Sequence, residues 1–166
     1  MSDFSFQHLV HLAALLIIGL AGGFFYTWQV SVIQGTLKVT DASYLETMKS
    51  INKEILNPFF FIIFFGALVI SLLDAALHIY SDWNSTATLF ITLAAIAYAL
   101  TFGITAFGNV PLNNALESLN LSALDIKELK DFRSYYEVTW NKYHLWRTWT
   151  SVLAFVFTII GTINSK

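Results

Sequence analysis

The sequence predicts an all-α protein, a bundle of four transmembrane helices that forms a single domain over residues 1–166. Four apolar stretches of about 19 to 24 residues are each long enough to cross a hydrocarbon core about 30 Å thick. These spans cover residues 9–32, 59–80, 86–107 and 145–163. The composition is 56% hydrophobic and only 12% charged, so lipid must cover much of the surface. The spans lack period-2 alternation, which excludes a transmembrane β-barrel.

The first span is predicted to be retained as a helix and not removed as a signal peptide. Residues 1–7 contain no Lys or Arg, and the apolar run that follows exceeds the 7–15 residues of a signal-peptide core. Gly19 and Gly23 are four residues apart, a spacing that predicts close approach of a neighbouring helix.

The first connection contains a predicted amphipathic helix over Ser43–Leu56, lying along the membrane interface. Its apolar residues recur at helical spacing, with charged residues between them. Asn57-Pro58 then begins the second span, since proline is favoured in the first turn of a helix.

The third connection begins with a predicted turn, in which Asn109 caps a helix that starts near Pro111. From Asp125 a helical pattern continues without a breaking residue to Ile163. We therefore expect the fourth helix to extend below the membrane from around Phe132.

Basic residues predict the orientation in the membrane. They lie in the two long connections, as Lys38, Lys49, Lys53, Lys127, Lys130, Arg133 and Lys142. The positive-inside rule then places both long connections in the cytoplasm and both termini outside. A net charge of −2 without a basic patch argues against nucleic acid as a partner, and zero cysteines exclude disulfides and thiol chemistry.

The clearest chemical signal is a stripe of polar and aromatic residues on the fourth helix. The stripe follows 3–4 spacing and consists of Arg133, Tyr136, Trp140, His144, Arg147 and Ser151. Such groups are costly inside a bundle unless they find partners. A structural alternative is that the aromatic residues and Arg anchor the helix at headgroup depth.

Residues from the other helices converge on the same cytoplasmic end of the bundle. Trp28, Asn57, Asn109 and Asn113 are all predicted to surround His144 and Arg147 there. An Asn alone is more often a turn or cap residue, but several amides beside a His and an Arg indicate a polar pocket between helices.

These features together resemble the anthrone oxygenase-like family of small four-helix membrane proteins. The resemblance extends over essentially the whole chain, and its most specific elements are Asn109-Val110-Pro111-Leu112-Asn113 and Trp140-x3-His144-x2-Arg147. It also includes the glycine-rich first span that ends before Gly35, and Asn57-Pro58. The resemblance implies oxidation of anthrones to anthraquinones by O2 without metal or flavin.

The residues themselves are consistent with such chemistry. His144 is a candidate base for an acidic carbon beside an aromatic ketone, and Arg147, Asn109 and Asn113 are candidates to hold the enolate oxygen. The substrate-binding candidates are Trp28, Asn57, Tyr136 and Trp140. The rings of Trp28, Tyr136 and Trp140 can stack on a planar molecule. An electron-rich enolate can pass an electron to O2 directly, so no cofactor is required.

A second constellation lies at the opposite end of the bundle. His8 and His11 are near the start of the first span, and Asp74 and His78 are near the end of the second. Such ligands suit zinc, copper, iron or haem. The structural alternative places the histidines among wet headgroups, with Asp74 bonded to a neighbouring hydroxyl. An Asp within a span is in either case not expected to face lipid.

Three hypotheses follow from the sequence. The first is an oxygenase-like enzyme with its pocket at the cytoplasmic end, the second is a metal or haem protein, and the third is a non-catalytic membrane subunit or small-molecule binder. The expected partners are membrane lipids and a hydrophobic small molecule, with a homo-oligomer or a larger membrane complex left open.

Overall fold

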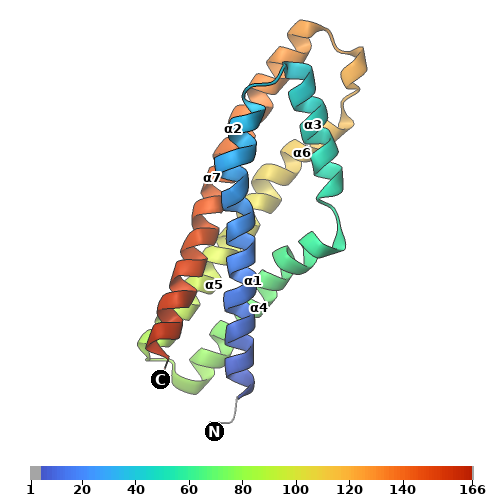
Figure 1. Ribbon diagram of the computed structural model, residues 1–166. Coiled ribbons are helices and arrows are strands. Elements are labelled where there is room, and N and C mark those ends of the chain that lie inside the picture. Colours follow the sequence, from blue (N-terminus) through green and yellow to red (C-terminus); the bar gives the residue numbers. More distant parts are fainter. Residues whose placement is uncertain (1–4, 166) are drawn as a thin grey trace.

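A computed structural model describes residues 5–165, which fold into helices with no strand among them. The first long helix is α1 (Phe6–Thr27), which continues through the π-helical turn η1 (Trp28–Val32) into α2 (Ile33–Thr36). It is followed by α3 (Asp41–Glu54), α4 (Pro58–Asp82) and α5 (Thr86–Ile104), the π-helical turn η2 (Thr105–Asn109), α6 (Val110–Ser118), the 3-10 turn η3 (Leu121–Ala123) and α7 (Ile126–Asn164). Both chain ends lie at one end of an elongated bundle, here called the terminal end (Figure 1). The opposite end, formed by α2, α3, α6 and the start of α7, is called the far end.

Four continuous helices are long and apolar enough to cross a membrane. They cover Phe6–Thr36, Pro58–Asp82, Thr86–Ser118 and Ile126–Asn164. The all-α fold with four transmembrane helices is therefore confirmed, and the protein is a multi-pass membrane protein. Which end faces the cytoplasm, and whether the chain forms an oligomer, remain predictions.

The helix starts follow from local sequence chemistry. A side-chain oxygen of each preceding residue accepts a backbone N–H of the first turn, which satisfies a donor that the helix leaves unpaired. These capping residues are Ser5, Thr40, Asn57, Ser85 and Asp125. At Asp125 the cap is reciprocal, because the Glu128 side chain accepts the Asp125 backbone N–H at 2.8 Å.

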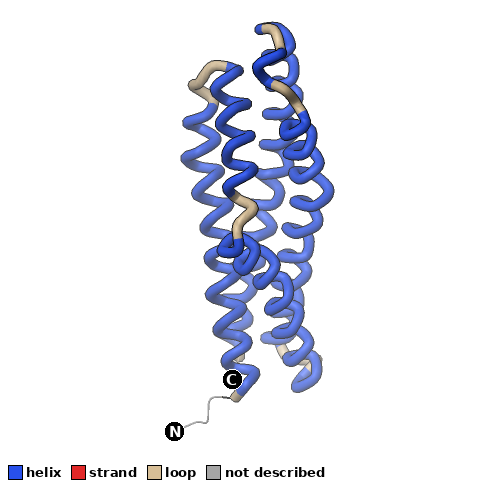
Figure 2. Tube along the Cα trace, turned by 90° about the vertical axis from the view of Figure 1, so that its right-hand side faces the viewer, coloured by secondary structure: helices blue, strands red, loops and turns tan. Residues whose placement is uncertain are grey.

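The centre of the bundle is packed with small residues. Ala14, Ala67 and Ala154 come from three different helices and are fully buried. Small side chains allow close helix approach where lipid provides no hydrophobic driving force. α7 packs against both α1 and α5 and runs through nearly the full length of the molecule (Figures 1 and 2). The fourth helix is therefore unbroken from Ile126, as predicted.

The far end is held by α3 folded against α6 and α7. The predicted helix at residues 43–56 forms as α3 at Asp41–Glu54. Its apolar face, with Tyr44, Leu45 and Met48 buried, contacts α6 and α7. Burial raises the pKa of the Tyr44 phenol above its ordinary value, so this group stays neutral. A position of α3 at the membrane surface remains a prediction.

The turn predicted at Asn109 is wrong. The chain stays helical from Thr86 to Ser118, and the Asn109 side chain forms no cap. The π-helical turn η2 ends at Asn109, two residues before Pro111, and the wider helix at this point accommodates a residue that lacks a backbone N–H. A π-helical turn gives no clear sequence signal, which explains the error.

The prediction for the glycines of α1 is correct at one position and wrong at the other. A Cβ added to Gly19 would lie 2.8 Å from Phe155 Cε2, so this glycine does admit a neighbouring helix. Gly23 has nothing within 4 Å of such a Cβ. Gly22 is the residue beside α7, since its Cβ would lie 3.5 Å from the Ser151 carbonyl oxygen.

Candidate functional site

The polar stripe of α7 faces the interior of the bundle. Tyr136 and His144 are fully buried, Trp140 is 3% exposed and Arg147 is 8% exposed. The 3–4 spacing of a straight helix places these side chains on one face, and that face meets η1 and η2. Four large polar or aromatic side chains therefore line one interior face of α7.

His144 is fixed on both ring nitrogens. Its Nδ1 accepts from Arg147 Nε at 3.1 Å and from Arg147 Nη2 at 2.9 Å. A guanidinium only donates, so Nδ1 carries the lone pair and Nε2 carries the hydrogen. Nε2 then donates to the Phe25 carbonyl oxygen at 3.2 Å. The ring is stacked on Trp140, with centroids 5.0 Å apart and an angle of 6° between the planes.

Arg147 carries a buried positive charge without a carboxylate. Among residues 5–165 it forms no ion pair, whereas Arg133 on the same helix is paired with Asp41 and Glu137. The Arg147 guanidinium instead lies 4.7 Å from the centre of the Phe25 ring and 5.0 Å from that of Trp140. Ring faces compensate only part of the cost of burying a cation. The geometry therefore favours an anionic group beside Arg147.

Asn113 organises a second layer around the stripe. Its Oδ1 accepts from Trp140 Nε1 at 2.8 Å and from Tyr136 Oη at 3.2 Å. The Tyr136 oxygen in turn accepts from Asn52 Nδ2 at 3.3 Å, which joins α3 to the network. These bonds hold the Trp140 ring, and through its stacking they hold His144.

Asn109 and Asn57 have other partners. Asn109 is fully buried and donates from Nδ2 to the Trp140 carbonyl oxygen at 3.1 Å, while its Oδ1 has no hydrogen-bond partner in the described part of the chain. Asn57 caps α4, accepting from Phe60 N at 3.0 Å and donating to the Glu54 carbonyl oxygen at 2.7 Å. Among residues 5–165, neither amide forms a hydrogen bond with His144 or Arg147.

A cavity of about 90 Å³ opens beside this site. Trp28, Asn113, Trp140, His144 and Arg147 line it, together with Asn52, Thr105 and several apolar side chains. A second cavity of about 230 Å³, lined by Asn57 among others, adjoins it. The two share the side chains Phe24, Phe25, Ile55 and Phe60 as a common wall. Together the two cavities form an aromatic pocket with one cation, Arg147, and three amides, Asn52, Asn57 and Asn113.

Sequence reasoning missed Phe25, which contributes both a carbonyl acceptor for His144 and a ring face for Arg147. Phe25 lies three residues before Trp28, and this i,i+3 spacing could have placed it on the same helix face. Thr105 was also missed, because the π-helical turn η2 shifts the helix face that points into the cavity.

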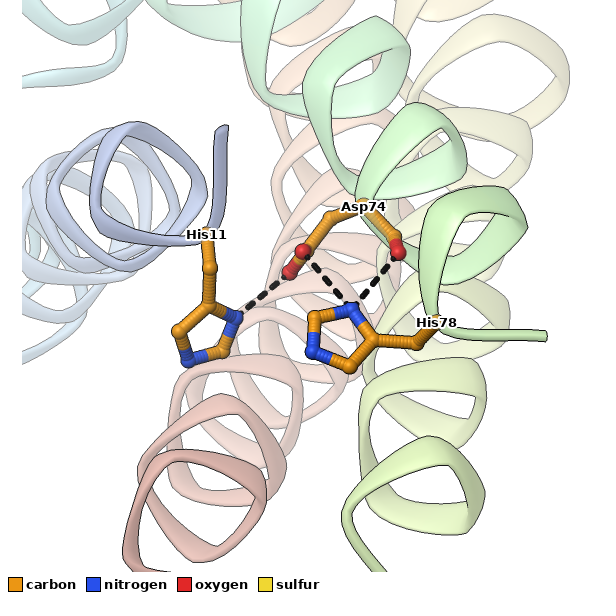
Figure 3. Close-up of side chains that lie close together, drawn as sticks. All are labelled: His11, Asp74 and His78. Carbon is orange, nitrogen blue, oxygen red and sulfur yellow. Dashed lines mark hydrogen bonds and ion pairs between the residues drawn. The ribbon is translucent and has the colours of Figure 1, made fainter. Parts of the chain in front are cut away.

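Three of the four residues of the second constellation come together near the terminal end. His11 Nδ1 lies 2.8 Å from Asp74 Oδ2, and His78 Nδ1 lies 3.2 Å from Asp74 Oδ1 (Figure 3). Asp74 is 1% exposed, which confirms that it does not face lipid. His8 is not part of this group of three and instead bonds Ser5 Oγ at 2.8 Å.

Comparison with known families gives a match over residues 59–157 to the anthrone oxygenase family model. The chain belongs to the anthrone oxygenase family. The matched range includes Asn109, Asn113, Tyr136, Trp140, His144 and Arg147, whereas Trp28 and Asn57 precede it. No curated protein and no solved structure matches the chain.

Proposed function

We propose that this protein is an oxygenase that uses O2 to oxidise an anthrone-like planar aromatic ketone, bound as its enolate beside His144 and Arg147. The observation that carries this proposal is the buried Arg147 guanidinium, which has no carboxylate partner among residues 5–165 and lines an aromatic cavity. An enolate supplies the missing negative charge and a flat ring system for the surrounding aromatic faces. Membership of a generally cofactor-independent family supports the same chemistry.

The first step is proton transfer from the CH2 carbon of the substrate to His144. The ketone oxygen attracts the Arg147 guanidinium, which turns from His144 Nδ1 towards the oxygen and frees the nitrogen lone pair. The bond from Nε2 to the Phe25 carbonyl oxygen keeps the ring in place and keeps the lone pair on Nδ1. Arg147 thus alternates between masking the base and holding the enolate oxygen.

The remaining steps need only O2. The enolate passes one electron to O2, giving a carbon radical and superoxide, which combine at the deprotonated carbon. The resulting peroxide loses water, so the carbon becomes a second ketone. One anthrone and one O2 thereby give one anthraquinone and one H2O. The proton on His144 leaves with the departing oxygen, which restores the neutral base.

The pocket must widen when substrate binds. The two adjoining cavities of about 90 and 230 Å³ are small beside typical ligand sites of about 300–1,000 Å³. Their common wall consists of Phe24, Phe25, Ile55 and Phe60. Phe24 is 40% exposed and its ring packs against those of Phe25, Trp28 and Phe60, so its displacement exchanges these ring contacts for contacts with the rings of the substrate. We infer that a three-ring substrate occupies both cavities with this ring displaced.

The test compares variants of His144 and Arg147 in purified protein supplied with an anthrone, following O2 uptake and the absorbance of the quinone product. His144→Ala is expected to lower kcat about 10²–10⁴-fold through loss of the base. Arg147→Lys is expected to lower it about 10²–10³-fold, since Lys keeps the charge but loses the planar fork. Trp149→Phe, an exposed position on the same helix, is the matched control.

Folding must be followed beside activity. Retained helix content and an unchanged elution volume in inactive His144→Ala support a catalytic role. Wild-type turnover in that variant contradicts the assignment of the base. Loss of folded protein in both His144→Ala and Arg147→Lys, without turnover by the wild type, favours a non-catalytic membrane subunit.

A further inference from the structure

We propose that His11, Asp74 and His78 form a binding site for a divalent transition-metal ion of the zinc type, separate from the pocket of the far end. Asp74 and His78 are one turn apart on α4, and His11 of α1 faces them across the helix contact (Figure 3). Their ligand atoms all lie within 4.8 Å of one another, and all three residues are buried. Two imidazoles and a carboxylate are a donor set that suits Zn²⁺ and its neighbours.

Asp74 has an unused acceptor that points into this cluster. Its Oδ1 is buried and accepts no hydrogen bond from the residues that the structure describes. The closest donor, His78 Nδ1 at 3.2 Å, is directed at the Asp74 backbone carbonyl oxygen, 2.9 Å away. Among residues 5–165, no Lys or Arg forms an ion pair with Asp74. A carboxylate within a spanning helix is costly without a counter-charge, and a cation between Oδ1 and the imidazoles supplies it.

The separations of the ligand atoms are close to those of a tetrahedral zinc centre. Zn–N and Zn–O bonds of about 2.0–2.2 Å place neighbouring ligand atoms about 3.3 Å apart in a tetrahedron. The separation from His78 Nδ1 to Asp74 Oδ1 is 3.2 Å, and that from His11 Nδ1 to Asp74 Oδ2 is 2.8 Å. All of these ligand atoms lie within 4.8 Å of one another, so a modest inward movement of the side chains lets them share one ion. Binding through Nδ1 requires that each ring carry its hydrogen on Nε2, because a metal takes the nitrogen lone pair.

A third helix supports the orientation of His11. Its second ring nitrogen, Nε2, bonds Thr162 Oγ1 of α7 at 2.8 Å. Metal-bound histidines commonly have such a partner on the other nitrogen, which fixes the ring and the tautomer. The Thr162 bond therefore directs Nδ1 towards Asp74.

A polar cavity of about 570 Å³ connects the cluster with the terminal end of the bundle. His11 and His78 line it, together with the Asp82 carboxylate and the hydroxyls of Ser81, Ser85 and Thr88. This cavity offers a path for a hydrated cation and space for water as a fourth ligand. The bound ion would join α1 to α4, so it would stabilise the bundle without taking part in oxidation of the aromatic substrate.

The experiment titrates Zn²⁺ into chelator-treated protein in detergent by calorimetry, and repeats the titration with Co²⁺ to record its visible spectrum. Wild type is expected to bind one ion per chain, with the intense visible bands of four-coordinate Co²⁺ and a raised unfolding temperature. His78→Ala and Asp74→Asn are expected to weaken binding more than about 100-fold, because each removes a ligand.

Asp82→Asn is the matched control, since it removes a carboxylate of the same cavity that lies outside the cluster. Wild-type affinity in Asp82→Asn together with loss in His78→Ala supports the site. Absence of binding by wild type overturns the proposal, as does equal weakening in Asp82→Asn and His78→Ala, which would indicate general attraction of cations. If Asp74→Asn does not fold, His78→Ala and the Co²⁺ spectrum still decide the question. Loss of oxygenase activity alone does not affect this test.

Discussion

Asn113→Ala is expected to destabilise the protein, because Asn113 Oδ1 is the acceptor for two buried donors. These are Trp140 Nε1 at 2.8 Å and Tyr136 Oη at 3.2 Å, on side chains that are 3% and 0% exposed. A hydrogen bond contributes about 0.5–1.5 kcal/mol net, so losing both lowers the free energy of unfolding by about 1–3 kcal/mol. The measurement is reversible unfolding of the purified protein in detergent micelles.

Asn114→Ala is the matched control for this prediction. Asn114 is exposed on the same helix and makes no side-chain hydrogen bond within residues 5–165. Both variants replace Asn by Ala in α6, so the change in helix propensity cancels when their free energies of unfolding are compared. A double-mutant cycle with Trp140→Phe isolates one bond, since Phe lacks the indole N–H. In that background the cost of Asn113→Ala should fall by about 1 kcal/mol. A loss for Asn113→Ala within about 0.5 kcal/mol of that for Asn114→Ala would refute the reasoning.

Two further predictions concern local packing and capping. Gly161→Ala should destabilise the protein by about 1–3 kcal/mol, because the new Cβ would lie 2.6 Å from Ile91 Cγ1. At Gly103 a new Cβ would meet open space, so Gly103→Ala should stabilise the protein by about 0.5–1 kcal/mol in the same unfolding assay. Asp125→Ala removes the side-chain oxygen that accepts the Glu128 backbone N–H, while the backbone N–H of residue 125 can still donate to Glu128. The variant should cost about 1 kcal/mol, with faster hydrogen exchange confined to the first turn of α7. Equal stability of the two glycine variants, or unchanged exchange in Asp125→Ala, would contradict these assignments.

The helices and the buried stripe were predictable because they depend on local sequence alone. Length and hydropathy predicted the spans, and the 3–4 spacing of Tyr136, Trp140, His144 and Arg147 predicted a shared face that is indeed buried. Helical phase does not depend on the neighbouring helices, so no tertiary information was needed. The same reasoning correctly predicted that Asp74 avoids lipid.

The hydrogen-bond partners were not predictable from the sequence, because several donors or acceptors lie within reach of each polar group. Asn57 was predicted to lie at the pocket. Backbone groups on either side of the start of α4, however, provide partners for both its Nδ2 and its Oδ1. Arg147 bonds His144 on its own helix, an interaction that depends on rotamers and not on spacing alone. A hydrogen bond to a partner nearby in the sequence does not require a second segment to be ordered. Such a bond is therefore favoured over one to a distant partner.

The two π-helical turns explain why the pocket lies at this level of the bundle. Trp28 opens η1 and Thr105 opens η2, and both side chains line the cavity beside His144. A π-helical turn widens the helix and rotates the residues that follow, so two such turns on facing helices redirect side chains towards α7 at one depth. A π-helical turn replaces i→i−4 hydrogen bonds by i→i−5 bonds, and such turns frequently occur at functional sites. The site is therefore built from two distorted helices held against one straight helix, α7, which carries His144 and Arg147.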